Sequence, residues 1–385
     1  MIQGILLKKK TMKPHLCKSL LWLALVVVVT HQVYAENGEL DMGFKVSEHN
    51  LGKACKENIT CADDKWGLDL TIDLYQPFTS QCHQQPPGDL CARRQDHDGH
   101  FRNSHNEPFL ILACGGDADK SQYSRYAGSL ARLGYNVAVM NKVLFMTPPP
   151  PAPSQDKIMR NVVTAIDFHR VIEYAQTNVA LGINATSVVL LGHSYGGAMA
   201  LSNARGFCYS FFCGDGLPNM TSTQPNYPVE LSSAVIGGFV YGLSIYQFGF
   251  PGNPMDRELT NLNQDTQTAL PFFFMWGEYD VIVNNQRDEQ YIYRTTWENQ
   301  HATKAYAIGE NLDHDSMADE PFSGRNVMNS TLPRLIQIRR IAEVTDSWVQ
   351  YLMNGEHLES SAFCLQLGIP LLRNDQHRME CDLHE

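Results

Sequence analysis

The stretch VVLLGHSYGGAMA, residues 188–200, decides the fold that we predict for this chain. Four apolar residues end at Gly192, and a run of small residues begins at Gly196. This order predicts a buried strand, a sharp turn and a closely packed helix, with Ser194 at the turn. The helix N-terminus behind the turn favours a developing negative charge. The structural alternative is an ordinary strand-to-helix turn that contains a serine by chance.

Further apolar runs lie on both sides of this stretch and predict more strands. The predicted strands cover 69–75, 109–114, 135–140, 233–240, 272–276 and 304–308. Apolar residues at helical spacing predict helices over 126–133, 158–172 and 331–353. Near-continuous apolar strands that alternate with helices indicate an α/β fold, in which a mostly parallel sheet is covered on both faces.

The first 35 residues have the composition of a secretory signal. Five lysines precede an apolar run at 20–29, and Val33–Tyr34–Ala35 forms a small-residue cleavage site before Glu36. The run is too short for a comfortable membrane span, so we expect no stable span after cleavage. An uncleaved anchor is the alternative. Cleavage predicts a protein that is secreted or lies in the lumen of the secretory pathway.

The charge of the chain bears on its partners. The formal net charge is −11 for the whole sequence; without residues 1–35 it becomes −16, with 25 basic against 41 acidic residues. An acidic chain without a basic stripe argues against a nucleic-acid partner. The sequence does not define an oligomeric state.

The cysteines agree with secretion. Nine remain after the leader, and eight of them fall into neighbouring couples: Cys55 with Cys61, Cys82 with Cys91, Cys208 with Cys213, and Cys364 with Cys381. Short loops favour these pairings among the 105 that eight cysteines allow. The ninth, Cys114, follows an apolar strand and is interpreted as a buried free thiol. A catalytic cysteine is the alternative, but nothing near it in sequence would lower its pKa.

Two further patterns concern modification and metals. Acceptor tripeptides for N-glycosylation occur at Asn58, Asn184, Asn219 and Asn329. His97, His100 and His105 lie with two aspartates in a polar loop. Their spacing matches no established metal site, so we predict no metal and no other cofactor.

A serine nucleophile needs a base and an orienting acid, and later strands supply both. Asp280 follows the 272–276 strand by four residues, and His314 lies on the loop after the 304–308 strand. Both belong to the sheet edge where open α/β sheets bind their ligands. Glu278 is the alternative acid. His193, next to the nucleophile, is expected to point away from it and to be structural.

The oxyanion of an acyl-transfer reaction needs two N–H donors. The amide of Tyr195, directly after Ser194, is one candidate. Gly116, on the loop after the 109–114 strand, is the other because a glycine allows the backbone to approach closely.

This constellation resembles the α/β-hydrolase superfamily over roughly residues 66–356. The resemblance rests on the motifs LGHSYGG at 191–197 and WGEYD at 276–280, and on His314. It is similar to the branch of dienelactone hydrolases, platelet-activating-factor acetylhydrolases, chlorophyllases and polyester hydrolases. The motifs CGG at 114–116, Tyr126 with LARLGY at 130–135, and Ser347–Trp348 fit that branch. Relatives usually have His-Gly or Pro-Gly where this chain has Cys114–Gly115.

The resemblance implies an eight-stranded, mostly parallel sheet flanked by helices, here with disulfide-bearing extensions. The expected organisation is a signal at 1–35, a cysteine-containing lead-in at 36–106, a catalytic core at 107–356 and a cysteine-containing tail at 357–385. The implied activity is hydrolysis of a small-molecule or lipid-like carboxylic ester through an acyl-serine intermediate. A non-catalytic binding module and an amidase or peptidase that uses the same residues are the alternatives. The acyl specificity, and whether 204–268 forms a lid, stay open.

Overall fold

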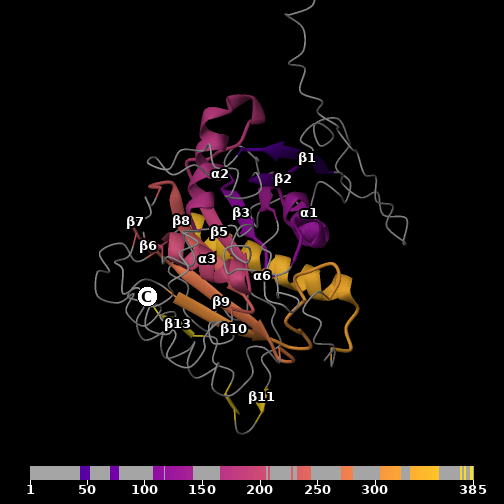
Figure 1. The fold of residues 1–385 in the computed structure, drawn as a ribbon. Helices are drawn as coiled ribbons and strands as arrows, with labels where there is room; N and C mark the ends of the chain where they lie inside the picture. The colour runs from indigo at the N-terminus through magenta and orange to yellow at the C-terminus, as the bar shows by residue number, and fades with distance from the viewer. Residues whose placement is uncertain are drawn as a thin grey trace, which may run out of the picture.

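A computed structural model describes residues 44–52, 70–77, 107–116, 118–141, 165–204, 207–208, 227–228, 232–243, 270–280, 304–321, 330–354, 373–374, 377–378 and 382–384. Within them, nine strands form one sheet in the order β1-β2-β4-β3-β5-β8-β9-β10-β13 (Figure 1). The strands are β1 (Phe44–Asn50), β2 (Thr71–Pro77), β3 (Phe109–Ala113), β4 (Asn136–Met140), β5 (Val188–His193), β8 (Val235–Tyr241), β9 (Phe272–Gly277), β10 (Lys304–Gly309) and β13 (Asp382–His384).

The middle of the sheet is parallel and its edges are antiparallel. Strands β4, β3, β5, β8, β9 and β10 pair in parallel with one another. On one side β1 and β2 add antiparallel strands, and on the other β13 pairs antiparallel with β10. This arrangement confirms the predicted α/β class with a mostly parallel sheet. Parallel strands need crossover helices, and these cover both faces.

Within the described residues, the α-helices divide into two pairs, one for each face of the sheet (Figure 1). Helices α2 (Ala165–Thr177) and α3 (Tyr195–Ala204) pack on one face, and α1 (Ser124–Arg132) and α6 (Arg334–Asn354) on the other. Successive residues of β3 alternate between the two hydrophobic cores: Phe109 and Ile111 join the first, and Leu110 and Leu112 the second. Side chains along a strand alternate in direction, so a strand that is apolar throughout is buried on both sides.

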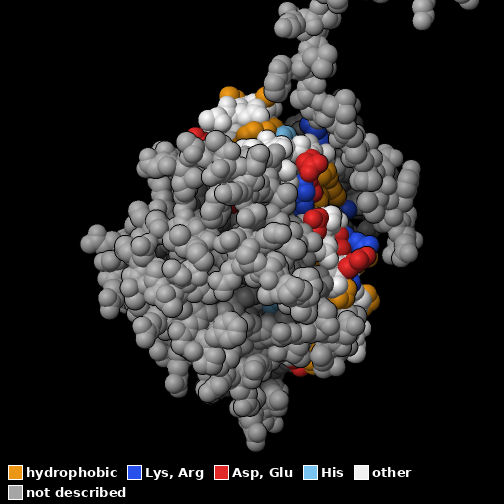
Figure 2. All heavy atoms as spheres, viewed as in Figure 1, with side chains coloured by type: hydrophobic (Ala, Val, Ile, Leu, Met, Phe, Trp, Pro, Cys, Tyr) orange, Lys and Arg blue, Asp and Glu red, His pale blue; other side chains and the backbone are white. Residues whose placement is uncertain are grey.

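Shorter elements complete the described part of the chain. They are two 3₁₀ helices, η2 (Lys120–Tyr123) and η4 (Val179–Leu181), and the two-residue strand pairs β6 (Phe207–Cys208) with β7 (Tyr227–Pro228) and β11 (Arg373–Asn374) with β12 (His377–Arg378). Lys120 of η2 forms ion pairs with Glu48 of β1 and Asp73 of β2, at 2.7 and 2.6 Å. On the described part of the face in Figure 2, acidic and basic side chains are interspersed.

The predicted strands and helices agree with the structure wherever it describes residues 107–356. The long helix predicted at 158–172 is described only from Ala165 onward, as α2. The edge strands β1 and β13 were not predicted, and they bring the sheet to nine strands. Among the described residues, no helix has the length and hydrophobicity needed to cross a membrane. The leader, the histidine-rich loop and seven of the eight couple-forming cysteines lie outside the described residues; Cys208 is described only by its backbone.

Candidate active site

Ser194 lies at the turn between β5 and α3 in a backbone conformation that serine seldom adopts. Its φ is +52°, in the left-handed region. The amide of Ser194 donates to the carbonyl of Tyr241 at 2.9 Å, and its carbonyl accepts from the amide of Gly197 at 3.0 Å. The turn is therefore fixed from both sides, at the N-terminus of a ten-residue helix.

The turn packs directly on the end of β3. A Cβ atom at Gly196 would lie 2.1 Å from the carbonyl oxygen of Ala113 and 2.5 Å from that of Cys114. Only glycine fits this contact, because backbone atoms cannot yield as a flexible side chain can. The contact brings the start of the loop that carries Gly116 against the first turn of α3, which begins at Tyr195. The two predicted oxyanion donors thus belong to adjacent segments, and their role remains a prediction.

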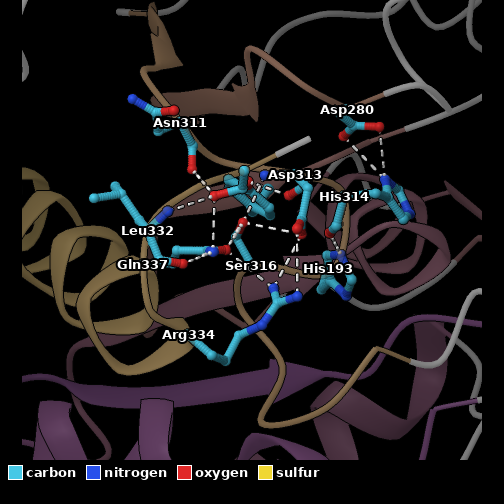
Figure 3. A network of polar contacts seen from close by, with 11 residues as sticks. His193, Asp280, Asn311, Asp313, His314, Ser316, Leu332, Arg334 and Gln337 are labelled. Carbon is cyan, nitrogen blue, oxygen red and sulfur yellow. Dashed lines mark hydrogen bonds and ion pairs between the residues drawn. The ribbon is translucent and has the colours of Figure 1, made fainter. Parts of the chain in front are cut away.

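Asp280 and His314 form a buried pair across the ends of β9 and β10. Nδ1 of His314 lies 3.0 Å from Oδ1 and 2.9 Å from Oδ2 of Asp280, and both side chains are almost fully buried (Figure 3). A carboxylate only accepts, so Nδ1 carries the proton and the neutral ring has its lone pair on Nε2. Glu278 instead accepts from the amide of Asn311 at 3.1 Å. The structure therefore pairs the predicted acid, and not its alternative, with His314.

Strand β8 connects this pair to the serine. The carbonyl of Tyr241 accepts a hydrogen bond from the amide of Ser194, and the next residue, Gly242, lies against the Asp280–His314 pair. A Cβ atom at Gly242 would be 3.0 Å from Nδ1 of His314 and 3.2 Å from Oδ2 of Asp280. The three predicted residues are thus brought together, although no hydrogen bond among the described ones joins the Ser194 hydroxyl to the His314 ring.

The loop that carries His314 is held by a buried polar network (Figure 3). The guanidinium of Arg334 donates to both oxygens of the Asp313 carboxylate, at 3.0 and 3.3 Å. Ser316 accepts from the Asp313 amide at 2.6 Å. The Tyr241 hydroxyl donates to the Asp313 carbonyl at 2.6 Å. The residue before His314 is therefore fixed through its amide, its carbonyl and its side chain.

Gln337 of α6 extends this network to the segment before the helix. Its side-chain amide nitrogen donates to the Leu332 carbonyl at 2.7 Å and to the Ser330 hydroxyl at 2.9 Å. The Ser330 hydroxyl in turn donates to the Asn311 carbonyl. None of these residues was predicted, because their partners lie on different elements. The one local signal was Asn311, which adopts a φ of +57° in an Asn-Leu-Asp-His turn.

Burial and charge set the proton affinity of the titratable groups here. Burial alone would lower the pKa of His314, but the charge and hydrogen bond of Asp280, with help from Asp315 and Asp313, raise it above the ordinary value. Burial raises the pKa of the Cys114 thiol well above its ordinary value, and its Sγ lies 3.2 Å from the Met140 carbonyl. Cys114 is therefore a buried free thiol, as predicted, in surroundings that disfavour the reactive thiolate.

Only one of the glycosylation candidates lies within the described residues. The side-chain oxygen of Asn184 accepts from the Thr186 hydroxyl at 2.6 Å and from its amide at 3.2 Å, in the turn before β5. In the part of the chain that the structure describes, no group of three or more His, Cys, Asp or Glu is placed to hold a metal ion.

No family model matches this chain, and no curated protein matches its sequence.

Proposed function

We propose that this protein is a secreted serine hydrolase with an α/β-hydrolase fold that cleaves carboxylic esters through an acyl-serine intermediate. One observation carries the proposal. A serine at positive φ on a strand-to-helix turn shares a sheet edge with a buried Asp280–His314 pair, and the three follow one another in the order Ser, Asp, His. That chain order and that turn are typical of α/β-hydrolases.

The first half of the reaction forms the acyl-enzyme. Nε2 of His314 takes the proton of the Ser194 hydroxyl while Oγ attacks the ester carbonyl carbon, and the electron pair of the C=O bond moves to oxygen. Amides at Tyr195 and on the Gly116 loop would hold that oxyanion. The intermediate collapses with cleavage of the bond to the alkoxy group, which leaves as the alcohol with the proton from His314.

The second half regenerates the enzyme by the same steps of proton transfer and nucleophilic attack. A water molecule gives a proton to His314, its oxygen attacks the acyl carbon, and the carboxylic acid leaves as Ser194 regains its proton. Asp280 keeps its negative charge throughout and stabilises the imidazolium. The raised pKa of His314 is the expected result of that pairing. The bond between Ser194 and His314 is expected to tighten when substrate binds, as it does in many enzymes.

The rest of the chain supports a secreted enzyme. We propose cleavage after Ala35, disulfides within the four cysteine couples and glycosylation at the four acceptor sites. The chain resembles hydrolases of polyesters and lipid esters, so we propose small or lipid-like esters as its substrates.

Covalent labelling tests the nucleophile. We expect an organophosphonate to add one equivalent to Ser194, which mass spectrometry of the labelled peptide identifies. Ser194→Ala is the matched control and should take up no label. A folded wild-type protein that stays unlabelled would contradict the proposal and favour a non-catalytic binding module.

Paired substrates test the reaction class. We expect p-nitrophenyl acyl esters to be hydrolysed much faster than the matching p-nitroanilides. A preference for the anilides would instead favour an amidase or peptidase. A series of acyl chain lengths, followed by a polyester film, then measures the size of the acyl pocket.

A further inference from the structure

His193 precedes the proposed nucleophile and lies between two other parts of the site. It is fully buried, with Nδ1 2.8 Å from the Tyr123 hydroxyl and Nε2 2.7 Å from the carbonyl oxygen of His314. Figure 3 shows it beside His314, and the centroids of the two rings are 5.0 Å apart. Both ring nitrogens of His193 are engaged in these contacts, which agrees with the structural role expected of it. These contacts suit a role in positioning other parts of the site.

Elementary hydrogen-bond chemistry fixes the direction of the bonds that His193 makes to Tyr123 and His314. The carbonyl of His314 only accepts, so Nε2 of His193 donates. Burial, and to a smaller extent the neighbouring His314, lower the pKa of His193 well below its ordinary value, so the ring is neutral and Nδ1 accepts. Burial also raises the pKa of Tyr123, whose hydroxyl stays protonated and donates to Nδ1.

The chain of bonds continues into the loop after β3. The amide of Gly115 donates to the Tyr123 hydroxyl oxygen at 2.9 Å. Three bonds therefore run in one direction: from the Gly115 amide to Tyr123, from Tyr123 to His193, and from His193 to the His314 carbonyl. One end lies beside Gly116, the proposed oxyanion donor, and the other is the backbone of the proposed base.

We propose that Tyr123 and His193 are positioning residues that hold the oxyanion loop and the base His314 in one geometry around Ser194. This inference rests on the proposed function. The chain passes through the residue next to the nucleophile, so it links all three groups that must be aligned in the transition state. Such alignment is worth a large factor in rate, and an error of about 1 Å can cost about 100-fold.

The neutral state of His193 is part of this arrangement. The titratable or charged groups that act on it are His314, Tyr123, Tyr241 and, farther away, Arg334. A protonated His193 would repel the imidazolium that forms on His314 during the reaction. The other neutral tautomer would set a lone pair against the His314 carbonyl. Only one protonation state of His193 therefore fits the chain.

Tyr123→Phe removes the middle of the chain and keeps the ring. We expect kcat for p-nitrophenyl butyrate to fall about 10- to 100-fold while KM changes less than about twofold, because alignment in the transition state is lost and not substrate binding. The matched control is Tyr126→Phe. Tyr126 is equally buried and makes one hydroxyl bond of the same length, 2.8 Å, but to Thr345 of α6 and away from the site.

The control separates positioning from stability. We expect both variants to lower the urea midpoint, Tyr123→Phe by more because its hydroxyl makes two bonds, whereas under conditions where both variants are fully folded only Tyr123→Phe lowers kcat. His193→Gln, which keeps a donor and an acceptor, should retain more activity than His193→Leu, which has neither. Equal loss of kcat in Tyr123→Phe and Tyr126→Phe, or no loss in either, would overturn the inference.

A measurement without turnover tests the chain directly. In protein labelled with ¹⁵N-histidine, we expect His193, assigned by its loss in His193→Gln, to give the Nε2–H tautomer from pH 5 to 8 without titrating. An Nδ1–H tautomer or a titration in that range would overturn the inference. A wild-type protein without esterase activity would contradict the proposed function, and the positioning role with it. An active wild type whose Tyr123→Phe variant keeps its kcat would contradict the positioning role alone.

Discussion

Ser194 and Asn311 are the two non-glycine residues with positive φ among those that the structure describes, at +52° and +57°. Both adjoin the proposed site: Ser194 is the proposed nucleophile, and Asn311 lies three residues before the proposed base. Strained backbone of this kind costs of order 1–3 kcal/mol and persists where the surrounding structure determines it. At Ser194, the backbone hydrogen bonds to Tyr241 and Gly197 hold the chain in this conformation.

The strain at Ser194 has a measurable effect on stability. We expect Ser194→Gly to be more stable than Ser194→Ala by about 1 kcal/mol, because glycine adopts positive φ freely and alanine does not. Neither variant should hydrolyse esters, so activity plays no part in the comparison. Urea unfolding of the two variants measures the difference. Equal midpoints would show that the turn relaxes once the hydroxyl is lost.

The pH dependence of activity follows from the His314–Asp280 pair. The base acts in its neutral form, and its pKa is raised, so kcat/KM should rise with pH through a pKa above 6.5. In Asp280→Asn the largest influence that raises this pKa is lost and only the weaker charges of Asp315 and Asp313 oppose burial, so this limb should move to lower pH. The activity itself should fall by about 10⁴-fold, as when the triad aspartate of a serine protease is replaced.

Pre-steady-state or pH–rate measurements from pH 5 to 9 on both proteins test this shift. Glu278→Gln is the control, because Glu278 bonds the Asn311 amide and does not touch the histidine. An acid limb that stays in place in Asp280→Asn would mean that another group controls ionisation of the base.

The elements show which parts of the fold the sequence could predict. Strands β3, β4 and β5 are buried on both faces, so their apolar runs identify them. The edge strand β1, FKVSEHN, is mostly half-exposed and carries no clear alternation, which is why its pattern gave no signal. Of the site, position after the strands and the chain order of hydrolases selected Ser194, Asp280 and His314 as candidates, and the structure places Asp280 against His314.

The supporting network could not be predicted, because its bonds join distant segments. Tyr123 and His193 are 70 residues apart, and the role of the histidine depends on a tautomer that its bond to the distant His314 carbonyl determines. Arg334 begins α6 and meets Asp313, 21 residues earlier, through the folded arrangement of helix and loop. A side chain that acts through another has no fixed spacing from the catalytic residues.

Helix α6 allows a test of the network with an internal control. Arg334 and Asp313 form a pair whose side chains are 13% and 7% exposed, whereas Arg339 and Glu343 form one whose side chains are 67% and 54% exposed. Arg334→Ala should lower the free energy of unfolding by about 3 kcal/mol, because the buried carboxylate loses its partner. Arg339→Ala should change it by less than about 0.5 kcal/mol.

Activity should distinguish these two variants as well. Arg334→Ala is expected to lower kcat, because Asp313 precedes the base on the same loop, and Arg339→Ala should leave kcat unchanged. Chemical denaturation and steady-state kinetics on both variants measure the two effects. Equal effects of the two substitutions would indicate that the network does not hold the loop.

At the scale of the molecule, the described residues form two hydrophobic cores, one on each face of the sheet, and Cys114 lies in the one beneath α1 and α6. Its thiol is fully buried and is a free cysteine of the described chain. If the other eight cysteines of the mature protein are paired, one thiol remains, and the whole fold protects it.

Thiol counting therefore tests the proposed disulfides. Without a reducing agent, we expect iodoacetamide to label no cysteine in the native protein and only Cys114 after unfolding in guanidinium. Peptide mapping by mass spectrometry identifies the labelled site, and Cys114→Ala, which should take up no label at all, is the control. More than one labelled position in the unfolded wild type would contradict the complete set of four disulfides.

The hydrogen bonds from His193 and Tyr241 to the carbonyls of His314 and Asp313 tie a turn beyond a strand end to the middle of the sheet. Such turns usually open at a lower free energy than the strands themselves. Here, opening would break bonds that begin on β5 and β8, so the turn and the central strands should unfold as one cooperative unit. Amide exchange in the loop that carries His314 should then be as slow as in the central strands. The proposed ester hydrolysis should be lost at the same urea concentration at which the whole fold unfolds.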